Sequence, residues 1–526
     1  MASQNVRATW VPSIALLSVF FAVQCFGEDA AVSRIARDLR YLASDDLEGR
    51  GVGTDGLTLA KQHIVQRFKS LGLQPGNGDS YEQPFSVLTG IEPKLKQTTL
   101  TLHGPQDRTI ELKIGADWQP MAIGGAANLE RVPIVFAGYG ISADDLNYND
   151  YKDVDVKGKV VLIIRREPQQ GDKDAKFDGT NTTRHSYINT KIRRAKEAGA
   201  KAILMVNDPF SVRKDKRDTL VTPHGFGFRS QGMPYVHLSH SVANQVLQQS
   251  PIQSDDTKLD TVDKLESHID EHFQPMTQPL PGWTIDLGMA WNQLHTDVSN
   301  VIAKLPGDGD KQNEFVVIGG HYDHLGMGGF GSRRPNVEQV HNGADDNASG
   351  TTAVLELARR YAQQPNTPRR TILFMLFSAE ERGLLGSNYY VANPLYPLAN
   401  TIAMINFDMV GRIRDDKLTV YGTHTGKQFA DLVDAAGQTS DLKLDKVRYI
   451  IGASDHFGFF KKQIPVIHFY SGFTDEYHTP DDDFETINVS GIARVVDYAK
   501  TFVDKVVDLD ERPEYVKVPL GKRRPR

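Results

Sequence analysis

The second half of the chain alternates short apolar runs with stretches in which apolar residues recur every three or four positions. Runs of this length, rich in β-branched and aromatic residues, predict buried parallel strands. Stretches with helical spacing, such as 351–361 and 492–507, predict helices that alternate with these strands or follow them. The pattern therefore predicts an α/β fold with a mixed, largely parallel central sheet and helices on both faces. The four runs cover residues 315–320, 371–379, 401–407 and 464–470.

Each apolar run stops at or shortly before a side chain that can bind a metal ion. Parallel strands present their carboxyl ends at one edge of a sheet, and open sheets of this kind bind ligands there. The pattern therefore predicts one crevice lined by histidine and acidic side chains. The residues that follow the four runs are His321, the pair Glu380 and Glu381, Asp408 and, after a short loop, His478.

The first half of the chain has a different pattern of apolar and polar residues. Residues 32–87 carry apolar residues at helical spacing, whereas residues 96–287 alternate short strands with turns and contain only one clear helical stretch, 189–198. A β-rich block between two helix-containing blocks predicts an inserted domain. We expect a main domain built from residues 28–95 and 291–510, an inserted domain over residues 96–290, and a basic tail over residues 511–526.

The amino-terminal segment has the pattern of an export signal. Arg7 precedes an apolar run over residues 10–21, and small or polar residues follow. This pattern predicts a signal peptide over residues 1–27, export to the periplasm or the extracellular space, and no stable membrane span after cleavage. The run is at the short limit for a membrane span, so a retained amino-terminal anchor is the alternative. Lipid attachment at Cys25 is a further alternative.

Composition and charge exclude some function classes. The chain has 526 residues, of which 40% are apolar, and a formal net charge of -6 with both signs interspersed. That balance gives no basic surface for nucleic acid. Cys25 is the single cysteine and lies in the segment expected to be removed, which excludes a cysteine nucleophile and a thiolate-bound metal. The oligomeric state is left open.

Five short segments carry the candidate chemistry. His321 is followed two residues later by Asp323, a carboxylate that can hold the proton on the second imidazole nitrogen. Asp345 and Asp346 precede a predicted helix, where they could cap it, or where one carboxylate could bridge two cations. Taken singly, the histidine and the acidic pair each have a structural explanation.

The other segments strengthen the metal hypothesis. Of the neighbours Glu380 and Glu381, one can bind a metal while the other acts on a substrate. Asp408 directly follows an apolar strand, where a buried acid costs several kcal/mol unless it is paired or metal-bound. Together with His478, five ligands on one sheet edge suit two metal ions with one bridging carboxylate. Oxygen and imidazole donors without thiolate favour zinc, with cobalt or manganese as substitutes, and predict hydrolytic chemistry.

Together these segments resemble the co-catalytic dizinc aminopeptidases, a family that includes bacterial leucyl aminopeptidases and glutamate carboxypeptidase-like metallopeptidases. The similarity covers about residues 300–507 and implies the zinc exopeptidase fold. The matching motifs are H-x-D at 321–323, G-A-D-D-N-A-S-G at 343–350, S-A-E-E-x-G-L-x-G-S at 378–387, N-x-D-M at 406–409 and Y-H-T-x-x-D at 477–482.

The resemblance implies an exported zinc-dependent aminopeptidase that hydrolyses amino-terminal residues from peptides with a hydroxide bridging two zinc ions. It also implies a cis peptide bond between Asp346 and Asn347. The resemblance also implies a role for each residue. One zinc would be held by His321, Asp346 and Asp408, and the other by Asp346, Glu381 and His478. Glu380 would be the general base, Tyr477 would stabilise the oxyanion, and Asp323 would be the partner of His321.

The inserted block resembles a protease-associated domain. The similarity rests on residues 134–140, 156–162 and 198–202. In this family, such domains cover the mouth of the active site.

Three other functions remain open for the same pattern. A carboxypeptidase on this fold would need a cationic pocket for the substrate carboxylate, which Arg412, Arg414 or Arg448 could provide. A glutaminyl-cyclase-like transferase would use a single zinc. A non-catalytic ectodomain of the transferrin-receptor type would share the domain plan without the chemistry.

Overall fold

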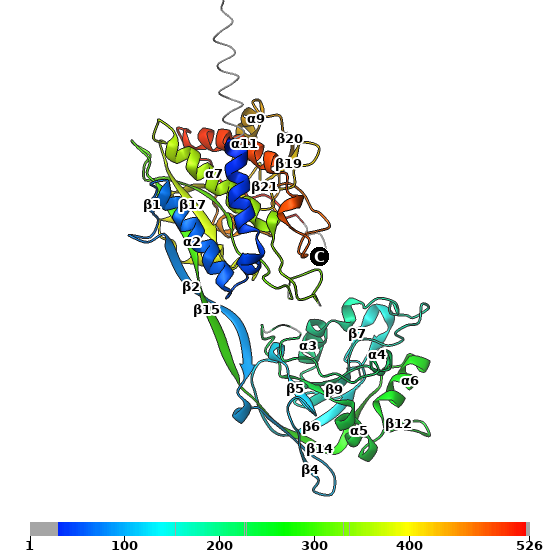
Figure 1. Ribbon diagram of the computed structural model, residues 1–526. Helices are drawn as coiled ribbons and strands as arrows, with labels where there is room; N and C mark the ends of the chain where they lie inside the picture. The colour runs from blue at the N-terminus through cyan, green and yellow to red at the C-terminus, as the bar shows by residue number, and fades with distance from the viewer. Residues whose placement is uncertain are drawn as a thin grey trace, which may run out of the picture. The chain divides into compact units, whose positions relative to one another are not determined.

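The computed structural model describes residues 30–521 except 153, 226, 228, 330 and 336. The chain divides into two compact units, the first comprising Met1–Val87 and Thr296–Arg526 and the second Leu88–His295. The expected inserted block, 96–290, lies within the second unit. Strands β2 (Glu82–Pro93) and β15 (Trp291–Leu305) connect the two units (Figure 1). The predicted signal peptide falls on residues outside the described part of the chain.

The first unit contains a nine-stranded sheet whose path is β1-β15-β17-β16-β18-β21-β19-β20, with β2 paired to β15. Strands β17, β16, β18 and β21 are mutually parallel, whereas β15 and β19 pair antiparallel with their neighbours β17 and β21. The predicted mixed, largely parallel sheet is confirmed. The remaining bounds are β1 Gln74–Pro75, β16 Phe315–His321, β17 Thr371–Phe377, β18 Thr401–Phe407, β19 Lys417–Tyr421, β20 Lys443–Val447 and β21 Val466–Tyr470.

Helices bury both faces of this sheet. Every residue of β16, β17 and β18 is buried, which is why these strands read as continuous apolar runs. Side chains alternate between two hydrophobic clusters, so that Val316 packs with one helix layer and Val317 with the other. One layer holds α2 (Asp55–Ser70), α7 (Gly350–Gln363), α9 (Phe429–Gly437) and α11 (Val489–Val507), and the other holds α8 (Leu385–Ala392) and α10 (His456–Lys461). A further helix runs from residue 30 to 42.

The register of the central strands brings their carboxyl ends level. Gly319 of β16 lies opposite Met375 of β17 and Asn406 of β18. The residues that follow these three strands therefore meet at one edge of the sheet, as the sequence pattern predicted.

The second unit is built on an eight-stranded sheet with the order β4-β3-β14-β6-β9-β10-β11-β5. Strands β6, β9, β10 and β11 are parallel to one another, and β14 joins them antiparallel to β6. The bounds are β3 Thr99–His103, β4 Thr109–Glu111, β5 Trp118–Pro120, β6 Ala127–Ala137, β9 Val160–Ile164, β10 Ala202–Val206, β11 Tyr235–Leu238 and β14 Thr277–Met289. Two short hairpins pair β7 (Ser142–Ala143) with β8 (Tyr148–Asn149) and β12 (Ile252–Ser254) with β13 (Thr257–Leu259).

The expectation of one clear helix in this block was wrong. Besides α3 (Ile188–Glu197), the second unit contains α4 (Pro209–Asp215), α5 (His240–Gln249) and α6 (Val262–His272). Ser239 and Thr261 cap the amino ends of α5 and α6 with their side chains. The capping residues and apolar spacing were present in the sequence, but the helices are short and lie among stronger strand signals.

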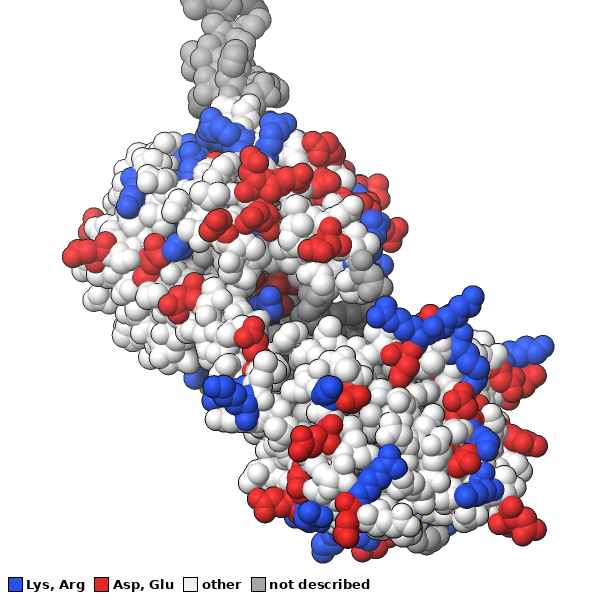
Figure 2. All heavy atoms as spheres, turned by 60° about the horizontal axis from the view of Figure 1, so that its bottom comes forward, with Lys and Arg blue, Asp and Glu red and all other residues white. Residues whose placement is uncertain are grey.

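The surface and the helices add two observations. On the face shown in Figure 2, basic and acidic side chains are interspersed over both units. Within the described part of the chain, no helix is both long enough and apolar enough to cross a membrane.

Candidate metal centre

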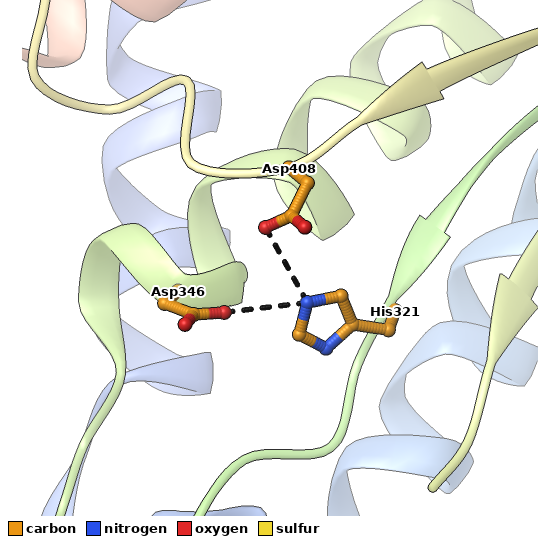
Figure 3. A group of neighbouring side chains, drawn as sticks. All are labelled: His321, Asp346 and Asp408. Atoms are coloured by element: carbon orange, nitrogen blue, oxygen red, sulfur yellow. Dashed lines mark ion pairs between the residues drawn. The ribbon is translucent and has the colours of Figure 1, made fainter. Parts of the chain in front are cut away.

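Two buried side chains and one partly buried side chain meet at the carboxyl edge of the first unit's sheet. His321 ends β16, Asp408 follows β18, and Asp346 lies in the turn before α7 (Figure 3). The Nε2 atom of His321 lies 3.3 Å from Oδ1 of Asp346 and 3.4 Å from Oδ1 of Asp408. The three donors are close enough to surround one cation.

Hydrogen bonds to Asp482, a residue distant in sequence, fix the turn that carries Asp346. Backbone N–H groups of Asp345 and Asp346 donate to the buried carboxylate of Asp482. Asp482 in turn accepts from Nη2 of Arg412 at 2.7 Å. The peptide bond between Asp346 and Asn347 is cis, as the family resemblance implied. The hydrogen bonds to Asp482 hold Asp346 at the edge of the sheet.

A second group of donors shares Asp346. Nε2 of His478 lies 3.1 Å from Oδ2 of Asp346 and 3.2 Å from Oε1 of Glu381. His478 reaches this position through the loop after β21, and its Nδ1 lies 2.8 Å from the backbone oxygen of Gly331. That hydrogen bond fixes the ring so that Nε2 faces the carboxylates. The predicted ligands thus fall into two groups joined by Asp346.

The sequence reasoning missed His324, which belongs to the second group. Its Nδ1 lies 2.8 Å from Oε1 of Glu381, and the side chain is buried. His324, Asp346 and Glu381 together could surround a cation. A signal was available, because His324 directly follows the H-x-D motif in the sequence.

The chemistry of the cluster fits metal ions. Several of these buried donor atoms lie within ion-pair distance of one another, yet none makes a hydrogen bond of ordinary geometry among the described residues: Nε2 of His321, both ring nitrogens of His324, Oε1 of Glu381 and Oδ1 of Asp408. Unpartnered buried polar atoms are costly, and cations placed between them would satisfy them. Imidazole and carboxylate donors without thiolate suit zinc.

Glu380 lies beside these donors. Burial, together with the charges of Glu381 and Asp408, raises the pKa of Glu380 well above its usual value, although His321 acts in the opposite direction. Cations beside Glu380 would act in the opposite direction and favour its ionised form. Glu380 thus has the environment of a group that exchanges a proton with a bound molecule.

Asp323 contacts the second imidazole nitrogen of His321 through its backbone oxygen, and not through its carboxylate as the sequence predicted. Nδ1 of His321 lies 3.1 Å from the backbone oxygen of Asp323, whereas the nearer carboxylate oxygen is 3.8 Å away. The carboxylate instead accepts from the backbone N–H groups of Glu380 and Glu381, at 3.0 and 3.3 Å. Asp323 therefore orients both the histidine and the segment that carries the two glutamates.

Arg50 supports the site from the interior, and sequence reasoning gave no hint of it. Its fully buried guanidinium donates to the backbone oxygens of Tyr322, Asn342 and Gly343, at 2.8, 2.7 and 3.0 Å. Burial lowers the pKa of Arg50 to about 10 despite the nearby acidic groups. The side chain ties the segment after β16 to the segment before Asp346.

A cavity of about 440 Å³ opens from the cluster. Tyr477 lines it and stacks on the ring of His478, with 3.8 Å between ring centroids. None of the described residues that line this cavity is lysine or arginine. Of the arginines considered for a cationic pocket, Arg412 is paired with Glu476 and Asp482, and Arg414 donates to the backbone oxygen of Phe473.

Comparisons with known proteins match two regions of the chain to protein families. Residues 300–503 match peptidase family M28, and residues 130–246 match the PA domain. The M28 match covers every residue of the two donor groups.

Two curated relatives and one solved structure are similar to the chain. Aminopeptidase YwaD of Bacillus subtilis (strain 168) is 26% identical over 417 residues, which cover 77% of this chain and 74% of that protein. A probable zinc metalloprotease of Pyrenophora teres f. teres (strain 0-1) is 38% identical over 118 residues, 22% of this chain and 23% of that protein. The structure of an aminopeptidase from Aneurinibacillus sp. strain AM-1 has the same fold, with a TM-score of 0.51, 23% identity, and coverage of 94% of this chain and 98% of that chain.

Proposed function

We propose that this chain, which carries a peptidase family M28 domain over residues 300–503 and a PA domain over residues 130–246, is a zinc-dependent aminopeptidase that removes residues from the free amino end of peptides. The observation that carries the proposal is the position of Asp346 between two groups of buried donors. The similarity to aminopeptidase YwaD and to a probable zinc metalloprotease supports both the metal and the type of bond.

The proposed site holds two zinc ions. His321, Asp346 and Asp408 would hold one ion, and Asp346, Glu381 and His478 the other, so that Asp346 bridges them. When bound, such a pair supplies a water molecule of lowered pKa and polarises the carbonyl group of the peptide.

The side chains around the ions perform the remaining steps. Glu380 accepts the proton of the attacking water and passes it to the amine that leaves when the peptide bond breaks. The hydroxyl group of Tyr477 donates to the oxygen of the carbonyl as negative charge develops on it. Asp323 keeps His321 and the glutamate segment in place.

The cavity favours an aminopeptidase over a carboxypeptidase. A carboxypeptidase would bind the terminal carboxylate with a cationic side chain. Among the described residues, no lysine or arginine lines the cavity, and Arg412 is already engaged by two carboxylates.

We also propose that the chain is exported, with residues 1–27 as the signal peptide. The observation behind this proposal is the sequence pattern of Arg7 followed by an apolar run. Mass spectrometry of the protein isolated from the periplasm or the medium should find an amino terminus near residue 28. An intact amino terminus in membrane fractions would contradict cleavage.

One peptide series tests the reaction. Peptides with a free amino end, a blocked amino end or a blocked carboxyl end are incubated with the zinc-loaded protein, with and without a chelator. We expect cleavage of every peptide with a free amino end, no cleavage when that end is blocked, and loss of cleavage with the chelator. Cleavage that requires a free carboxyl end would refute the proposal in favour of a carboxypeptidase.

A further inference from the structure

We propose that the cavity selects substrates whose first residue is lysine or arginine, through Asp445 and a wall of aromatic rings. The inference rests on the proposed aminopeptidase function and names its substrate class. The part of the cavity away from the metal donors is lined by side chains of β19, β20 and β21 and of the loops that follow β20 and β21.

The strand register places Asp445 at the far end of a row of lining side chains. Thr419 of β19 lies opposite Asp445 of β20 on one side and opposite Tyr470 of β21 on the other. Directly paired residues point to the same face of a sheet. Phe469, next to Tyr470, is paired with Phe407, which precedes Asp408. The row therefore leads from the metal donors across the sheet to Asp445.

The length of this row sets the length of side chain that fits. Adjacent strands are about 4.8 Å apart, so Tyr470 and Asp445 are separated by roughly 10 Å across two strand spacings. A peptide carbonyl held at the metal donors lies at the near end of the row. A leucine or valine side chain ends well before Asp445, whereas the long stems of lysine and arginine bring their charged groups toward it.

Aromatic rings line the path between the two ends. The ring centroid of Tyr421 is 6.1 Å from that of Tyr449 and 6.2 Å from that of Tyr470, and Tyr470 is 6.3 Å from Phe473. All four rings line the cavity. Such rings cover the aliphatic stem of a long side chain and attract a cation at its end.

Asp445 is available to a ligand. Among the described residues it has neither an ion pair nor a hydrogen bond through its side chain, and it is exposed. The two lysines nearest to it on β20 are engaged elsewhere: Lys443 lies 3.6 Å from Asp416, and Lys446 lies 2.7 Å from Asp434. With no lysine or arginine among the described lining residues, the cavity favours a cation and disfavours an acidic side chain.

The decisive comparison is between lysine and norleucine, which has a similar length without the charge. We expect kcat/KM for lysyl amides to exceed that for norleucyl amides by about tenfold or more, because an aromatic wall and a carboxylate each contribute. Asp445→Asn should bring the ratio close to one by lowering kcat/KM for the lysyl amide. Asp445→Lys should reverse the preference toward glutamyl amides. Asp431→Asn, which removes an exposed carboxylate of α9, is the matched control and should leave the ratio unchanged.

Binding measured without turnover separates this inference from the proposed function. Calorimetry compares free lysine with free norleucine on the zinc-loaded protein and on Asp445→Asn. Tighter binding of lysine that depends on Asp445 supports the pocket, even if no peptide is cleaved and the proposed function fails. Equal binding of the two amino acids, or a lysine preference that survives Asp445→Asn, overturns the inference even if the enzyme is an active aminopeptidase.

Discussion

Nδ1 of His324 lies 2.8 Å from Oε1 of Glu381, the same carboxylate oxygen that lies 3.2 Å from Nε2 of His478. His324 therefore either adds a fourth donor to the second metal position or fixes the carboxylate that binds there. In both cases we predict that His324→Gln lowers the affinity for the second zinc by roughly 10- to 100-fold. Titration of the apoprotein with zinc against a competing chelator measures this change.

A histidine of the same unit provides the control for His324. His63 pairs with Asp38 at 3.2 Å and is not among the metal donors. His63→Gln should leave both zinc affinities unchanged. A His324→Gln protein that folds with the wild-type unfolding temperature and binds two zinc ions with wild-type affinity would contradict the prediction.

Glu380 and Glu381 are adjacent in sequence but should respond to mutation in opposite ways. Glu380→Gln should keep both zinc ions and lose activity by about 10²- to 10⁴-fold, the contribution of a positioned general base. Glu381→Gln should lose zinc, since its Oε1 lies among the donors of the second group. Elemental composition and peptide hydrolysis are measured on both variants, and near-normal turnover by Glu380→Gln would exclude its role as base.

The two aspartates before α7 form a second matched pair. Asp346 faces both donor groups, whereas Oδ1 of Asp345 accepts from the backbone N–H of Gly411 at 2.7 Å. Asp346→Asn should therefore bind less than one zinc ion per chain. Asp345→Asn should retain both ions. Equal zinc content in Asp346→Asn and wild type would show that Asp346 does not bridge.

Much of the fold could be predicted from the sequence, because buried parallel strands leave long apolar runs. The run at 401–407 coincides with β18, and that at 315–320 falls one residue short of β16. The residues after these runs lie at one edge of the sheet because parallel strands share their direction. Short capped helices such as α5 carry a weaker signal, which neighbouring strands obscured.

The supporting residues of the site could not be predicted in the same way. Arg50 binds backbone oxygens of residues 272 to 293 positions away in sequence, and nothing local to Arg50 indicates those partners. The carboxylate of Asp323 accepts from the backbone N–H groups of Glu380 and Glu381, and not from the imidazole of His321 two residues away in sequence, because the turn after β17 brings those N–H groups close. Contacts between distant segments follow from tertiary packing, which periodicity does not encode.

The pH dependence of stability should include a contribution from Glu356 of α7. Its buried carboxylate accepts from Arg34 at 2.9 Å and from Arg359 at 2.7 Å. Burial alone would raise the pKa of Glu356, but these arginines hold it at about 2, below the usual 4.5. The ionised carboxylate of Glu356 therefore makes its full contribution to the free energy of unfolding above about pH 4.5. This contribution is lost as the pH falls through about 2.

We predict that Glu356→Gln lowers the free energy of unfolding by roughly 2–3 kcal/mol at pH 6, and that the difference from wild type shrinks as the pH falls from 4.5 toward 2. Denaturant unfolding at several pH values measures the difference. Glu514→Gln removes the exposed pair with Lys427 and should change stability by less than about 0.5 kcal/mol. A pH-independent difference for Glu356→Gln would contradict the assignment.

Metal removal should destabilise the first unit alone. The carboxylates of Asp323, Asp346, Glu380 and Asp408, of which the first three are buried, repel one another unless cations lie between them, whereas the second unit contains none of the metal donors. Binding at zinc concentrations far above the Kd stabilises the folded unit by about 4 kcal/mol, so a chelator should lower its unfolding temperature by roughly 10 °C. Scanning calorimetry resolves the two units. Asp346→Asn should already unfold at the lower temperature and show no further shift, and a chelator that shifts both units equally would contradict a site confined to the first.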